Sequence, residues 1–187
     1  MQNNYARRSV RLKNYDYSQA GAYFVTICTQ KKEYLFGTIK DGKIVLNDAG
    51  EIVNEFCTKT ESHFTNTIFD AFVIMPNHFH AIITVGAGFP RPVKNQIHDG
   101  RGDPAPTLGN IVGFFKYQTT KQINILRQTP GHKLWQRNYY EHVIRDENDY
   151  QRIYKYIQNN PLKWASDSLH PQNCTDAAHR VPIDQKS

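Results

Sequence analysis

Two apolar runs that are separated by only two residues constrain the fold more than any other feature of the sequence. Residues 68–75 (IFDAFVIM) and 78–85 (HFHAIITV) are rich in β-branched and aromatic side chains, which favour strands. Pro76 and Asn77 lie between them and favour a tight turn. Strands joined by so short a connection pair antiparallel. We therefore expect an antiparallel sheet that contains this pair.

The remaining elements follow from apolar periodicity and from turn and cap residues. Residues 23–29 (YFVTICT) predict a buried strand, residues 135–144 (WQRNYYEHVI) predict a last strand, and Asp41-Gly42 predicts a hairpin between FGTIK and KIVLN. Three helices are expected, each after a side chain that can cap it. The first begins after Asn47 or Asp48 and ends near Ser62, and the second begins after Thr107 and ends near Gln128. The third begins after Asp146 and ends before Pro161.

Apart from the hairpin, the predicted order is β-α-β-β-α-β followed by a helix. This order indicates an α+β, ferredoxin-like (split βαβ) fold, in which two helices cover one face of an antiparallel sheet and a C-terminal helix follows. The 187 residues suffice for one such domain. We expect a basic arm at residues 1–20, the domain at 21–164, a flexible loop rich in glycine and proline at 86–106, and a polar tail at 165–187.

Composition favours a polyanionic partner. The net charge is +6, and the first thirteen residues contain Arg7, Arg8 and Arg11 without any acidic residue. Eleven tyrosines and ten phenylalanines add rings on which unpaired bases can stack. The three cysteines form no CxxC pair, the N-terminal segment has no apolar core, and no run reaches the ~20 apolar residues of a membrane span. We expect a cytoplasmic protein with no membrane partner.

His78 and His80 are two residues apart on a predicted strand, so both imidazoles lie on one face. Such a pair is suited to hold one metal ion. For an isolated HxH pair the alternative, two polar residues that face solvent on an ordinary strand, is the commoner one. The pair therefore needs a second feature before it predicts a metal site.

Tyr156 and Asn160 provide that second feature, because their i, i+4 spacing places them one above the other on the last helix. Tyr150, Ile153 and Ile157 form the apolar stripe of this helix, and Tyr156 lies beside it. A tyrosine there can simply line the edge of a core. A phenol nucleophile, an amide oxygen and a histidine pair are nevertheless the groups that phosphodiester cleavage requires.

Two blocks of the sequence resemble a known family. MPNHFH at residues 75–80 is similar to the histidine-hydrophobic-histidine motif of HUH endonucleases, with its Pro-Asn lead-in. LWQRNYYEHVIRDENDYQRIYKYIQNNPLKW at residues 134–164 resembles the C-terminal block of REP-associated tyrosine transposases, with WQR, YEHxIR and YIxxNP elements. The resemblance extends over residues 23–164, and the two blocks in this order are far more specific than either alone.

The resemblance implies a metal-dependent endonuclease and strand transferase for single-stranded DNA. His78, His80 and Asn160 would hold Mg²⁺ or Mn²⁺, and Tyr156 would attack the phosphate to form a 5′-phosphotyrosine intermediate. The implied substrate is an imperfect hairpin of the REP type, bound by a monomer or a homodimer. Residues expected to contact DNA are Arg7, Arg8, Arg11, Lys116, Lys121, Tyr139, Tyr140 and Trp164.

Several alternatives stay open at this point. Tyr117 is a rival nucleophile, although Lys121 and not a ligand-type residue follows it at i+4. Glu141 and His142 can either orient a metal ligand or be ordinary strand residues. The chain can also be a nucleic-acid-binding module derived from such a nuclease, or a hydrolase that uses water and keeps Tyr156 for structure. No partner is evident from spacing for the remaining histidines, which are His63, His98, His132, His170 and His179.

Overall fold

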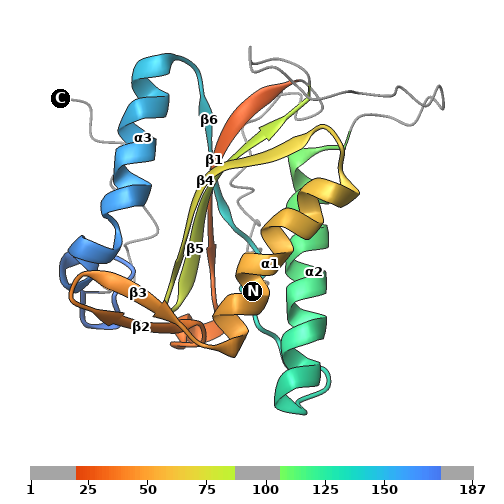
Figure 1. Cartoon of the computed structure of the whole chain (residues 1–187), viewed down its shortest axis with the longest axis vertical. Coiled ribbons are helices and arrows are strands. Elements are labelled where there is room, and N and C mark those ends of the chain that lie inside the picture. Colours follow the sequence, from red (N-terminus) through yellow and green to blue (C-terminus); the bar gives the residue numbers. More distant parts are fainter. Residues whose placement is uncertain (1–19, 87–105, 174–187) are drawn as a thin grey trace, which may run out of the picture.

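A four-stranded antiparallel sheet forms the centre of the molecule (Figure 1), in the strand order β4-β5-β1-β6. A computed structural model describes residues 20–86 and 106–173; the expected arm, most of the loop and the end of the tail lie outside them. The strands are β1 (Gly21–Cys28), β4 (Thr67–Met75), β5 (His78–Val85) and β6 (Tyr140–Ile144). The α+β fold with an antiparallel sheet is confirmed.

Helices cover both faces of this sheet. In Figure 1, α1 (Asp48–His63) and α2 (Leu108–Arg127) lie against one face and α3 (Glu147–Asn159) lies against the other. Each helix begins where the cap residues predict, because a side-chain oxygen accepts a first-turn N–H. Asn47 accepts from the Gly50 amide at 3.0 Å, Thr107 from that of Asn110 at 3.2 Å, and Asp146 from that of Asp149 at 2.8 Å.

The predicted hairpin forms a separate two-stranded sheet of β2 (Gly37–Lys40) and β3 (Lys43–Leu46). Its two turn residues, Asp41 and Gly42, have φ angles of 50° and 70°, as a tight hairpin turn requires. The hairpin lies against the short 3-10 helix η2 (Pro161–Ser166). A Cβ added to Gly42 would be 2.5 Å from Leu162 Cδ2, so glycine also permits this close approach.

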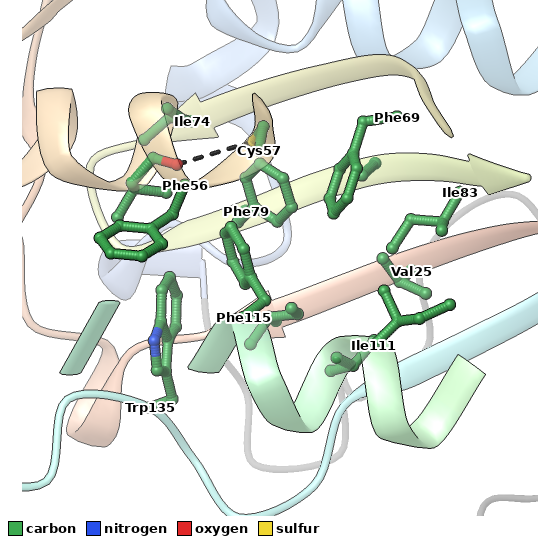
Figure 2. Packing of buried hydrophobic residues seen from close by; sticks show 14 of the residues in the cluster. Val25, Phe56, Cys57, Phe69, Ile74, Phe79, Ile83, Ile111, Phe115 and Trp135 are labelled. Carbon is green, nitrogen blue, oxygen red and sulfur yellow. Dashed lines mark hydrogen bonds between the residues drawn. The ribbon is translucent and has the colours of Figure 1, made fainter. Parts of the chain in front are cut away.

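Alternation along the strands divides the apolar residues into two cores. The larger core lies between the sheet and the α1–α2 pair, where Phe79 of β5 stacks on Phe115 of α2 with ring centroids 5.0 Å apart (Figure 2). The smaller core lies under α3, which contributes Ile153 and Ile157. Its other buried members are Ala22, Phe24, Ala71, Ile82 and Ile144. Alternate residues of β5 therefore face different helices.

The last strand is shorter than predicted. β6 begins at Tyr140, and Trp135 forms only an isolated bridge with Thr29. The indole of Trp135 is buried in the larger core and donates from Nε1 to Thr119 Oγ1 at 2.9 Å. Lys116 Nζ donates to the carbonyl oxygens of Gln136 at 2.7 Å and Arg137 at 3.0 Å. A side chain thus satisfies backbone groups that a strand partner would otherwise bond.

The packed domain continues past Trp164, where the sequence was expected to enter a polar tail. After η2 the chain forms a second 3-10 turn, η3 (Pro171–Asn173), and Asp167 and Leu169 between the two turns are buried. Within residues 20–86 and 106–173, no helix combines the length and the apolarity that crossing a bilayer would require.

Candidate active site

The two histidines of β5 face α3 and are both fully buried. His78 Nδ1 lies 2.8 Å from Asn77 Oδ1, and His80 Nδ1 lies 2.8 Å from Thr26 Oγ1. Because an amide oxygen only accepts, His78 donates from Nδ1 and keeps a lone pair on Nε2. The ring centroids of the two histidines are 4.5 Å apart. The strand thus holds two imidazoles side by side in defined orientations.

Burial keeps these imidazoles neutral. It lowers the pKa of His78 to about 4, although the charge of Asp167 and the Asn160 amide both act to raise it. It also lowers the pKa of His80 well below its ordinary value, and the neighbouring His78 lowers it further. Neutral imidazole is the form that binds a metal ion. At neutral pH the pair therefore needs no deprotonation before it can act as a ligand.

Tyr156 of α3 reaches this pair. Its hydroxyl lies 3.3 Å from His80 Nε2, and its ring packs edge-on against His80 and against Phe24 of β1. The ring is half-buried because the neighbouring Ile153 and Ile157 fix the face of α3 that meets the sheet. Burial raises the pKa of the Tyr156 phenol, and the negative charge of Asp167 raises it further. The phenol is therefore protonated in the resting site.

Asn160 and Asp167 complete the cluster. Asn160 Nδ2 donates to Asp167 Oδ2 at 3.0 Å, and this bond fixes the orientation of the Asn160 amide. Among the described residues, Asn160 Oδ1 and His78 Nε2 are buried with no hydrogen-bond partner. Ligand-type atoms of His78, His80 and Asp167 all lie within 4.8 Å of one another. Buried unpartnered acceptors that converge in this way suit a bound cation.

Sequence reasoning missed Asp167. It lies in an irregular segment whose only sequence signals are polarity and the preceding proline, and no periodic pattern marks it as buried. Its carboxylate accepts from the Leu169 amide at 2.6 Å, while the Leu169 carbonyl accepts from Asn77 Nδ2 at 2.9 Å. A series of hydrogen bonds therefore connects His78 to Asn160 through Asn77, Leu169 and Asp167.

The rival nucleophile is remote from this cluster. Tyr117 is 64% exposed on α2, which covers the opposite face of the sheet (Figure 1). Lys121 is also exposed on α2. The ammonium group of Lys116 is engaged with the two carbonyl groups described above, and burial lowers its pKa to about 8. These positions are poorly placed to assist chemistry at His78 and His80.

The aromatic residues that the sequence predicts to contact DNA do not all lie on the same face of the sheet. Tyr140 pairs with Thr26 across β1 and β6, and Thr26 pairs with His80, so Tyr140 lies in the same row as the histidine. Tyr139 packs on the larger core instead. The ring of Trp164 lies 6.0 Å from that of His78. Arg7, Arg8 and Arg11 lie outside the described residues.

Neither proposed orienting residue contacts a histidine of the pair. His142 Nε2 lies 2.7 Å from Asp149 Oδ2 and so joins β6 to α3, while Glu141 is opposite Val25 and faces the larger core. The groups that orient the pair are Asn77 and Thr26. The other described histidines are His63, which stacks on Phe114, His132, which is exposed, and His170, which contacts Trp164.

Comparison with known proteins shows which proteins this chain resembles. No protein-family model matches the chain. An uncharacterized protein of Haemophilus influenzae is 41% identical over 170 residues, which cover 88% of this chain and 93% of that protein. A proposed REP-associated tyrosine transposase of the same organism is 26% identical over 160 residues, covering 81% and 77% of the two chains.

A solved structure is similar to this chain at the level of the fold. The structure of a REP-associated tyrosine transposase bound to a REP hairpin superposes with a TM-score of 0.52 at 19% identity, and covers 95% of this chain and 92% of its own. This likeness shows that the two proteins share an α+β fold. In sequence and in fold, the chain resembles REP-associated tyrosine transposases.

Proposed function

We propose that the protein is an endonuclease and strand transferase for single-stranded DNA that forms hairpins, with Tyr156 as its nucleophile. The observation that supports this proposal most is the position of the Tyr156 hydroxyl, 3.3 Å from His80 Nε2, beside the buried unpartnered atoms His78 Nε2 and Asn160 Oδ1. A nucleophile beside a set of metal ligands is an arrangement suited to phosphodiester cleavage.

The residues present fit a divalent cation. Two neutral imidazoles together with an amide oxygen or a carboxylate suit Mn²⁺ and accommodate Mg²⁺. His78, His80 and Asn160 would hold the ion, and Asp167 either joins them or orients Asn160 from behind. The chemistry that such an ion supplies is stabilisation of negative charge on a phosphate and on an attacking oxygen.

The residues of this chain define the covalent step. Tyr156 Oη forms a bond to phosphorus, the bond from phosphorus to the 3′ oxygen breaks, and the phenol proton passes to water. The 3′ oxygen takes up a proton and leaves as a 3′ hydroxyl, so the 5′ phosphate stays on the tyrosine. Attack by the 3′ hydroxyl of another strand reverses these steps and joins the two strands without an external energy source.

Hairpin DNA is the substrate that the family suggests, since the related transposase was solved with a REP hairpin. Unpaired bases next to a hairpin would stack on aromatic rings, and basic side chains would bind the phosphates. Tyr140 and Trp164 lie on the face of the sheet that carries the histidines. Phosphate contacts are proposed for Lys121 and, outside the described residues, for Arg7, Arg8 and Arg11.

Mass spectrometry of the protein after incubation with a hairpin oligonucleotide and Mn²⁺ tests this function. We expect a covalent adduct on Tyr156. Tyr156→Phe keeps the ring and its packing but lacks the attacking oxygen, so it forms no adduct while its melting temperature and DNA affinity are retained. Tyr117→Phe is the matched control and still forms the adduct. An adduct on the Tyr156→Phe protein would place the nucleophile elsewhere and refute the assignment.

A further inference from the structure

Three aromatic rings form a cluster beside His78 that belongs to neither hydrophobic core. The Trp164 ring of η2 lies 6.0 Å from that of His78, 5.7 Å from that of Tyr34 and 4.7 Å from that of His170. Tyr34 Oη also lies 3.4 Å from His170 Nε2. Tyr34, Trp164 and His170 are here called the aromatic platform. Its members come from segments far apart in the sequence and meet next to a candidate metal ligand.

The platform is too exposed to serve mainly as core packing. The side chain of Tyr34 is 51% exposed, and Trp164 and His170 are half-buried. Trp135, the other tryptophan of the chain, is 6% exposed and packs inside the larger core. Rings that close a core are buried as Trp135 is. Aromatic faces left open beside a candidate active site are suited to stack on a flat ligand.

Positive charge accompanies these rings. Lys31 and Lys32 lie in η1 (Gln30–Lys32), three and two residues before Tyr34, and have φ angles of 54° and 56°. This left-handed conformation is uncommon for residues other than glycine and is concentrated at functional sites. The Lys32 carbonyl accepts from Asn77 Nδ2 at 3.4 Å, and Asn77 orients His78. The strained turn is thus connected to the metal site.

The charge of the lysines selects the kind of ligand. Lys32 lies near the site, because its carbonyl oxygen accepts a hydrogen bond from the Asn77 side-chain amide that also bonds His78. An aromatic surface alone can also bind cations. Two lysines in the adjoining turn oppose a cation and favour a ligand that combines a flat ring with negative charge. A nucleotide of single-stranded DNA has both properties.

We propose that the aromatic platform stacks an unpaired base of the nucleotide next to the phosphate that Tyr156 attacks, while Lys31 and Lys32 contact the phosphates on the same side. The proposal rests on the proposed function and adds to it the position of the strand relative to the metal site. It also gives a role in DNA binding to Tyr34, which no motif in the sequence marks.

Tryptophan fluorescence tests the platform directly, because the chain has only two tryptophans and Trp135 is buried. The Tyr156→Phe protein, which binds without cleaving, is titrated with a hairpin oligonucleotide that has a single-stranded flank. We expect quenching that Trp164→Phe abolishes. Tyr34→Ala should weaken binding by about 5- to 150-fold, the range expected for one stacked base. Tyr34→Phe should bind normally, and Tyr117→Ala, which removes another exposed tyrosine, is the matched control.

A series of oligonucleotides, each of which lacks one base, identifies the nucleotide that stacks on the platform. Abasic sites are placed one at a time along the flank; at one position the abasic site should weaken binding to the parent protein but not to Tyr34→Ala. Unchanged affinity of Tyr34→Ala, or fluorescence that DNA does not quench, would overturn the proposal. Adduct formation is measured separately with Tyr156 intact. An adduct without quenching refutes only the platform, whereas quenching without an adduct refutes only the nuclease and leaves a base-binding site.

Discussion

Asp167→Asn tests the series of hydrogen bonds that connects His78 to Asn160 beside the candidate metal site. The two carboxylate oxygens accept from Asn160 Nδ2 and from the Leu169 amide, and the side chain is 8% exposed. An amide at this position offers one oxygen and one NH2 group, so one of the two donors loses its acceptor. Such a loss next to a charged acceptor costs about 1.5–3 kcal/mol of unfolding free energy.

Removal of a buried charge also relieves its desolvation, which opposes this loss. We therefore expect the free energy of unfolding to fall by about 1.5 kcal/mol, the lower end of that range. For a chain of this size, the melting temperature should then fall by roughly 3–6 °C. Metal binding should change more. Loss of a group that orients a metal ligand typically weakens affinity by about 10–100-fold, and Asp167 orients the Asn160 amide.

Thermal unfolding measures the change in melting temperature, and calorimetric titration with Mn²⁺ measures the affinity of the protein for the ion. Asp48→Asn is the matched control, because it makes the same chemical change at an exposed residue of the first turn of α1. If Asp167→Asn left both the melting temperature and the Mn²⁺ affinity unchanged, Asp167 would neither support the fold nor orient Asn160. Weaker Mn²⁺ binding at unchanged stability would instead favour direct ligation by Asp167.

Three further results are expected. His78→Ala and His80→Ala should each abolish strand cleavage and the rise in melting temperature caused by Mn²⁺, and normal cleavage by both variants at low metal concentration would contradict the site. Affinity for a hairpin with a single-stranded flank should fall steeply with salt as bound counterions are released, and a blunt duplex that binds equally well would oppose this view. Partial burial acts to raise the pKa of Asp149, but hydrogen bonds from His142 and Arg152 lower it overall from its ordinary 3.8. The Asp149 carboxylate therefore stabilises the fold at pH values above 3.8, and this stabilisation is lost as the pH falls below that value. In urea unfolding at two acidic pH values, the free energy of unfolding of Asp149→Asn should fall less between the two than that of the parent protein.

The regular part of the fold and most of the candidate site, all but Asp167, could be predicted from the sequence. Strand alternation placed His78 and His80 on one face, and helical spacing placed Tyr156 and Asn160 together, because both depend only on local periodicity. The caps Asn47, Thr107 and Asp146 were predictable for the same reason, since a cap is a contact over three residues.

Contacts between irregular segments could not be predicted. Asp167 is buried because the chain after Pro161 turns back over the histidines, and no repeat in the sequence encodes that path. Residues 135–139 have strand-like composition, yet Lys116 from a distant helix bonds the carbonyl groups there. Tyr34 was missed because its partner Trp164 is remote in the sequence. In each case tertiary contacts decided the outcome where local propensity was weak or misleading.

The unequal sizes of the two cores determine which part of the domain opens first. α3 is anchored by Ile153 and Ile157, which together contribute about 3–6 kcal/mol, whereas complete unfolding of a domain costs about 5–15 kcal/mol. Hydrogen exchange of amides in α3 can therefore proceed through partial opening, while β1 and β5 keep their protection until the whole sheet unfolds. Because Tyr156 lies on α3, the distance between its phenol and the histidines depends on how α3 packs against the sheet.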